Sequence, residues 1–133
     1  AEPSNDQATT LLAQALLGSD VEQALKTVER IGLGSAHLEA ADSIRTLARM
    51  SRSIETPQSL PEDQVKDRYV NAIRATRSND FEVALDGFIE VIRKNRYYDD
   101  DGSRKACIAI FKLLGEDHEI TRRHRTTFSS ALY

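Results

Sequence analysis

One ten-residue pattern occurs twice in this chain, at an offset of 60 residues. Residues 19–28 read SDVEQALKTV and residues 79–88 read NDFEVALDGF, so the two copies share an Asp, a Glu, an Ala and a Leu. In each copy the Asp can cap a helix, the small Ala allows a second helix to approach, and a bulky residue follows four positions later. This pattern is typical of stacked helical hairpins, which bury together the faces that a single hairpin cannot bury alone.

The rest of the sequence also favours helices. Apolar residues recur at helical spacing, only six Gly and three Pro interrupt them, and no alternating run favours a strand. We therefore predict an all-α fold of stacked antiparallel helical hairpins. It has about seven helices, which begin near residues 4, 20, 35, 62, 80, 100 and 117.

The first and the last of these helices carry clear apolar stripes. In the first helix we expect an inward stripe of Leu11, Leu12, Ala15 and Leu16. In the last helix, after a cap at Asp117, the residues at positions i, i+4 and i+8 are Ile120, His124 and Phe128. This spacing predicts that the His124 imidazole is at least half-buried.

The clearest break in the helical pattern is the segment TPQSLP at residues 56–61. A residue that precedes a proline is biased away from helix, and this segment contains two prolines. We predict a single domain over residues 1–133, in which subdomains 1–56 and 62–133 are joined by the connector 57–61.

Composition excludes several classes of function. A single Cys leaves no disulfide framework, CxxC redox pair or cysteine-rich zinc site. The net charge of −3 and the aromatic content of 6% do not favour nucleic acid, and no apolar run approaches the length of a membrane span. We expect no catalytic residues and no cofactor, because no nucleophile triad, carboxylate pair or glycine-rich phosphate loop is present.

The remaining candidate sites have simpler interpretations. The run of Asp at 99–101 resembles a calcium loop, but alignment on the following Gly places Tyr97 and Ile108 at ligand positions. The spacing of the three His residues and Cys107 matches no metal pattern, so we expect no metal. We interpret Cys107 as a small core residue, with a redox thiol beside Arg104 and Lys105 as the alternative.

The two junctions resemble the tetratricopeptide repeat (TPR). That family has a short turn, an acidic or aromatic residue, a Glu and an Ala-Leu pair at the start of the second helix, as in DVEQAL and DFEVAL here. Leu12 and Ala72 fall where the family places a small residue, and neither copy ends in the usual Pro. The offset of 60 also exceeds the TPR period of about 34 residues, because a helix over residues 35–53 and the connector intervene. The resemblance is to a degenerate TPR.

The last third of the chain resembles a narrower group. It contains an acidic turn followed by Arg104-Lys105, an FKLLG stop at 111–115, an Arg-rich helix and a Leu-Tyr end. These features resemble the C-terminal domain of bacterial thioredoxin–TPR fusion proteins of the YbbN or chaperedoxin type. Glu119 departs from the group, in which many members place a Pro.

The resemblance implies a role in protein quality control. Proteins of this type carry an N-terminal thioredoxin-like domain, hold unfolded or oxidised clients and deliver them to chaperones, including the chaperonin. Because the first residue is Ala and the start AEPSNDQ lacks the charged and apolar regions of a signal peptide, we expect the excised TPR portion of a cytoplasmic protein. The alternatives are a scaffold that dimerises, or orients the thioredoxin-like domain in redox homeostasis, and a redox function that involves Cys107.

We expect partner proteins to bind either in a helix-lined groove or on the last helix. On that helix we predict a charged rim of Arg122 and Arg125 around apolar anchors Phe128, Leu132 and Tyr133. The simpler interpretation is that Phe128 and Leu132 only pack the last helix onto the helix before it.

Overall fold

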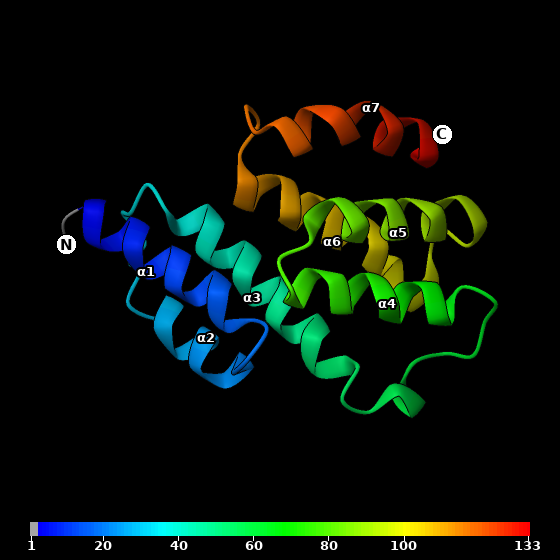
Figure 1. Ribbon diagram of the computed structural model, residues 1–133, viewed down its shortest axis with the longest axis horizontal. Coiled ribbons are helices and arrows are strands. Elements are labelled where there is room, and N and C mark those ends of the chain that lie inside the picture. Colours follow the sequence, from blue (N-terminus) through cyan, green and yellow to red (C-terminus); the bar gives the residue numbers. More distant parts are fainter. Residues whose placement is uncertain (1–2) are drawn as a thin grey trace.

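The computed structural model describes residues 3–133, and within that range every regular element is a helix. The seven α-helices are α1 (Pro3–Leu16), α2 (Val21–Val28), α3 (Leu38–Ser53), α4 (Lys66–Arg77), α5 (Phe81–Lys94), α6 (Tyr98–Leu114) and α7 (Glu119–Leu132). A 3₁₀ turn, η1 (Pro57–Ser59), lies in the proline-containing connector. The all-α fold predicted from the sequence is confirmed (Figure 1).

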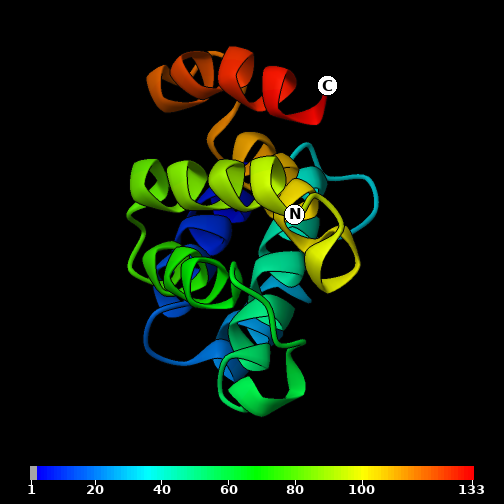
Figure 2. The ribbon, with the colours of Figure 1, turned by 90° about the vertical axis from the view of Figure 1, so that its right-hand side faces the viewer.

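The helices stack as antiparallel hairpins along the molecule. The pairs α1–α2 and α4–α5 form hairpins, and the long α3 lies between them and packs against α6 (Figure 1). The last helix, α7, lies over α5 and makes fewer contacts with α6 (Figure 2). One hydrophobic core runs through both predicted subdomains, and it includes Leu60 from the connector.

The structure explains the 60-residue offset of the repeat. The second helix of each copy begins at Val21 and Phe81, and the third begins at Leu38 and Tyr98, so each unit has three helices. Ala24 and Ala84 are fully buried, as are the bulky residues four positions later, Val28 and Phe88. The predicted packing at both junctions is confirmed. Helix α3, which lies between the two copies of the repeat, is the counterpart of α6.

The predicted inward stripe of α1 is wrong. Leu11 and Leu12 are 58% and 51% exposed, Ala15 is also exposed, and Leu16 is only half-buried. The inward face consists instead of Asp6, Thr10, Ala13 and Leu17.

Hydrogen bonds explain how this unusual inward face of α1 is tolerated. The Thr10 hydroxyl donates to the Asp6 carbonyl at 2.8 Å, and the Ser35 hydroxyl donates to the Asp6 carboxylate at 2.6 Å. At the other end of α1, the Gln14 amide donates to the Asn79 side chain at 2.8 Å. The buried polar groups therefore have partners, which makes a partly polar inward face of α1 tolerable.

One predicted helix start needs correction, whereas the start predicted near residue 100 agrees with the regular part of α6, which begins at Gly102. Helix α7 is capped by His118, whose Nδ1 accepts a hydrogen bond from the Ile120 amide at 3.1 Å, and not by Asp117. Helix α6 is counted from Tyr98, which is buried. Its next three residues, Asp99, Asp100 and Asp101, have φ of +53°, +53° and +64°, so a left-handed turn precedes the regular helix.

Candidate protein-interaction site

A groove runs between α3 and α6. The two helices are antiparallel, because the start of α3 meets the end of α6, where Glu39 Oε1 lies 3.5 Å from Lys112 Nζ. The groove has a volume of about 1010 Å³ and is lined chiefly by these two helices and by Tyr69 of α4. This groove is a candidate for the helix-lined groove in which we expect a partner to bind.

The groove combines apolar and charged side chains of both signs. Its apolar residues are Ala36, Leu38, Met50, Ile108 and Ala109, and its charged residues are Glu39, Asp42, Arg49, Asp99, Asp100, Lys105 and Lys112. The only Met of the chain is half-buried there, and a flexible thioether adapts to differently shaped partners. Within residues 3–133 Arg49 makes no ion pair, so this exposed guanidinium can bind an acceptor on a partner.

At one end of the groove, Tyr69 is held by a hydrogen bond and by ring contacts. The buried Tyr69 hydroxyl donates to Asp99 Oδ2 at 2.6 Å, and its ring makes edge contacts with Phe88 and Tyr98. Burial, and then the Asp99 carboxylate, raise the pKa of Tyr69, so the hydroxyl stays protonated and keeps donating. A Cβ on Gly102 would lie 2.1 Å from the Tyr69 hydroxyl, so this position has room only for Gly.

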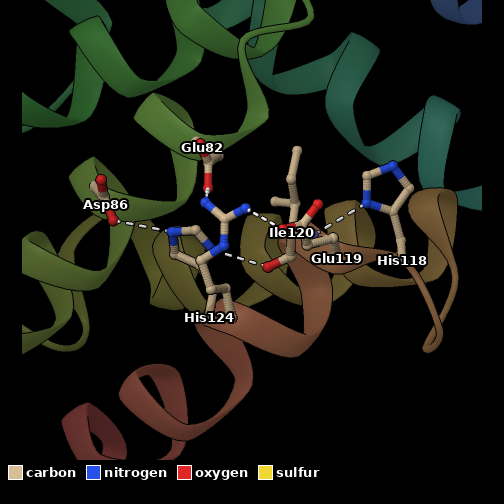
Figure 3. Close-up of polar contacts among 7 residues, drawn as sticks. Glu82, Asp86, His118, Glu119, Ile120 and His124 are labelled. Carbon is tan, nitrogen blue, oxygen red and sulfur yellow. Dashed lines mark hydrogen bonds and ion pairs between the residues drawn. The ribbon is translucent and has the colours of Figure 1, made fainter.

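Helix α7 is held on α5 by a row of polar contacts (Figure 3). Arg123 pairs with Glu82 of α5 and, at 2.8 Å, with Glu119 of its own helix. His124 Nε2 lies 3.1 Å from Asp86 Oδ1, and its Nδ1 lies 2.8 Å from the Ile120 carbonyl oxygen. Both partners are acceptors, so a doubly protonated ring donates to both and a neutral ring to only one.

Phe128, predicted as an exposed anchor, is buried. Its side chain is 4% exposed and packs edge-on against Phe111 of α6, with ring centroids 5.4 Å apart. Since its ring is covered by the domain itself, Phe128 is not part of an interaction surface, and the prediction is corrected. The burial of Phe128 agrees with the simpler interpretation, in which this residue only packs the last helix onto the helix before it. Helix α7 as a whole, however, lies mainly on α5.

The other predicted residues of α7 do not form one patch. Arg125 pairs with Glu116 and lies over the Phe111 ring, and its hydrogen bond lowers the pKa of Glu116. Leu132 is half-buried, and its carbonyl accepts from Arg96 at 2.9 Å. Only Arg122 and Tyr133 are exposed, and they lie at opposite ends of the helix, about 16 Å apart at 1.5 Å per residue.

The remaining candidates do not assemble into a chemical site. Cys107 is fully buried, and burial raises the pKa of its thiol, which agrees with a core role. Between residues 3 and 133 no three His, Cys, Asp or Glu side chains are grouped so that they could hold a metal ion. None of the described helices combines the length and the apolar character of a membrane span.

Comparison with known proteins assigns the family. The sequence pattern of the tetratricopeptide repeat matches residues 34–133, which include α3 to α7 and therefore both walls of the groove. The chain belongs to the tetratricopeptide repeat family. TPR domains generally mediate protein–protein interaction and are not generally enzymes. Neither the curated proteins nor the solved structures include a match to this TPR domain.

Proposed function

We propose that this TPR domain binds a polypeptide segment of a partner protein in the α3–α6 groove. The observation that carries the proposal is the groove itself, which has apolar side chains between charged ones and lies within the family match. A pocket of this size is at the upper end of those that hold small ligands, and helix-lined grooves commonly receive peptides.

The chemistry of the groove suits clients of varied sequence. Met50 and Ile108 are both half-buried and offer apolar contact to side chains that an unfolded protein exposes. The ion pairs Glu39–Lys112 and Asp100–Lys105 are exposed, so they can exchange partners at little cost. A surface of this kind selects for exposed apolar segments more than for one sequence.

The wider proposal places the domain in a chaperone or co-chaperone. It is supported by the resemblance of the last third to bacterial thioredoxin–TPR fusion proteins. In this role the domain holds unfolded clients in the cytoplasm beside a thioredoxin-like domain and passes them to a chaperone such as the chaperonin. The exposed Arg122 and Tyr133 on α7 remain candidates for that second contact.

Client binding is tested by blocking the groove. Thr46 lines the groove and is half-buried, so Thr46→Arg fills it from the α3 side without removing core volume. The matched control is Thr126→Arg, on the exposed face of α7. We expect fluorescence anisotropy to show at least about tenfold weaker binding of reduced, carboxymethylated α-lactalbumin to Thr46→Arg, a change of about 1.4 kcal/mol. Equal binding by both variants would contradict the groove.

Docking to a chaperone needs a separate experiment. Deleting α7 is unsuitable, because Phe128 belongs to the core. Arg122→Glu and Tyr133→Ala change only exposed side chains, and we expect each to weaken binding to purified bacterial chaperonin in surface plasmon resonance. If both variants bind as the native chain does, α7 is not the docking element.

The second candidate function is a scaffold that brings two chains, or a chain and a thioredoxin-like domain, together. The exposed leucines of α1 favour it, since large apolar side chains on a surface often mark an interface. The client-binding experiment distinguishes the two candidates, because a domain that serves only as a scaffold binds no unfolded client in the groove, and Thr46→Arg then changes nothing.

A further inference from the structure

The outer face of α1 is more apolar than the face that the domain covers. Ala13 and Leu17 are fully buried against the domain. A second row, consisting of Ala8, Leu11, Leu12 and Ala15, is exposed on the outer side. Apolar rows of an amphipathic helix normally face the core, so this exposed row on the outer side of α1 is unusual for a helix in contact with water.

The outer row is also free of charge. From Gln7 to Leu17 the sequence contains no Asp, Glu, Lys or Arg. Elsewhere the outer faces of the domain are charged, as on α7, where the exposed residues include Arg122 and Arg123. A second molecule can therefore approach α1 without like-charge repulsion or the cost of burying an ion.

The order of residues in the row is the same in both directions. Read from either end it is Ala, Leu, Leu, Ala, at positions i, i+3, i+4 and i+7 of one helical face. In an antiparallel pair related by a two-fold axis between positions 11 and 12, Leu11 faces the second copy's Leu12. Ala8 then faces the second copy's Ala15, and these small side chains allow the helices to approach closely. A two-fold interface requires this kind of self-complementary surface.

We propose that a second copy of this chain covers the outer face of α1, and that two α1 helices pair antiparallel about this axis. One helix pair buries less than the 1,200 Å² or so of a stable interface, so the dimer is weak and depends on concentration. We expect a dissociation constant on the order of 10⁻⁴ M. This dimer does not depend on the α3–α6 groove, and each can fail without the other.

The experiment is sedimentation velocity of the native chain from about 10 µM to about 1 mM, which brackets that constant. We expect the mean mass to rise towards that of a dimer. Leu11→Glu and Leu12→Lys each place a charge against an apolar neighbour and should weaken the dimer about tenfold or more. The matched control is Val83→Glu, which changes a residue of α5 that is 55% exposed and should leave the dimer unchanged.

Mixing the two charged variants tests the register. Because the axis pairs position 11 with position 12, Glu of one variant faces Lys of the other while the two remaining Leu side chains meet. The mixture should dimerise more strongly than either variant alone, and circular dichroism should show that both are folded. A native chain that stays monomeric to 1 mM, about ten times the expected constant, overturns the proposal. So does a dimer that Leu11→Glu leaves intact, or a mixture no stronger than its components.

Discussion

The two three-helix units of this domain have similar junctions and different surroundings. In the second unit, α4 is packed between α5 and α3, and its buried residues include Tyr69, Val70, Ala72 and Ile73. In the first unit, α1 lies at the edge and buries mainly one row of residues. All the Tyr and Phe residues lie in the second half of the chain, between positions 69 and 133.

This difference shows how one repeat pattern can serve two purposes. The second unit uses aromatic rings to fill a core, and that core fixes the end of the groove through Tyr69 and Asp99. The first unit has smaller side chains and leaves leucines at the surface. Equivalent substitutions in the two units should therefore differ in cost, and three such pairs, each at an offset of 60 residues, test the comparison.

The largest difference is expected at the bulky position of the junction. Phe88 and Val28 are equivalent and fully buried. Phe88→Ala should lower the free energy of unfolding by about 3–5 kcal/mol, and Val28→Ala by about 2 kcal/mol, because the larger ring leaves the larger cavity. Urea denaturation measures both values. An equal loss of stability in Val28→Ala and Phe88→Ala would contradict the expected difference between the two units.

A smaller difference is expected near the groove. Gly102→Ala places a Cβ against the Tyr69 hydroxyl and should cost about 1–3 kcal/mol, since the ring or α6 must move. The equivalent residue of the first unit is the exposed Asp42, and Asp42→Ala should cost under about 0.5 kcal/mol, because it removes an exposed ion pair with Arg45. Thermal unfolding measures both. Unfolding of Gly102→Ala at the native temperature would mean that Tyr69 does not restrict this position.

The smallest difference is expected at the helix caps. The Asp20 carboxylate accepts a hydrogen bond from the Gln23 amide at 3.0 Å, whereas Asp80, at the same place in the repeat, makes no such bond. Asp20→Ala should therefore cost about 1 kcal/mol, and Asp80→Ala only a few tenths. Urea denaturation resolves the pair, with Asp→Asn at each position as the conservative control. Equal costs would show that the identical sequence motif, and not the observed bond, sets the stability.

Much of the fold could be predicted from local sequence. The repeated junction predicted which small and bulky residues meet, and Ala24, Ala84, Val28 and Phe88 are all buried as expected. The stripe of Ile120, His124 and Phe128 predicted an inward face on the last helix, and His124 and Phe128 are buried. That stripe already argued against Phe128 as an exposed anchor.

The rest depends on contacts between distant parts of the chain. The groove forms because α3 and α6 lie antiparallel, about 60 residues apart, and no local pattern specifies such a pair. The outward row of α1 was missed because bonds with distant residues, between Asp6 and Ser35 and between Gln14 and Asn79, allow a partly polar face to turn inward. The left-handed turn at Asp99–Asp101 was missed because residues other than Gly rarely adopt positive φ.

The central claim is that a partner polypeptide binds between α3 and α6. The most direct measurement is the backbone amide spectrum of the isotopically labelled chain, recorded by NMR during titration with reduced, carboxymethylated α-lactalbumin. The account predicts that the largest shifts map to groove residues such as Thr46, Met50, Lys105 and Ile108. Shifts confined to the outer face of α7 or to α1, with the groove amides unmoved, would contradict it.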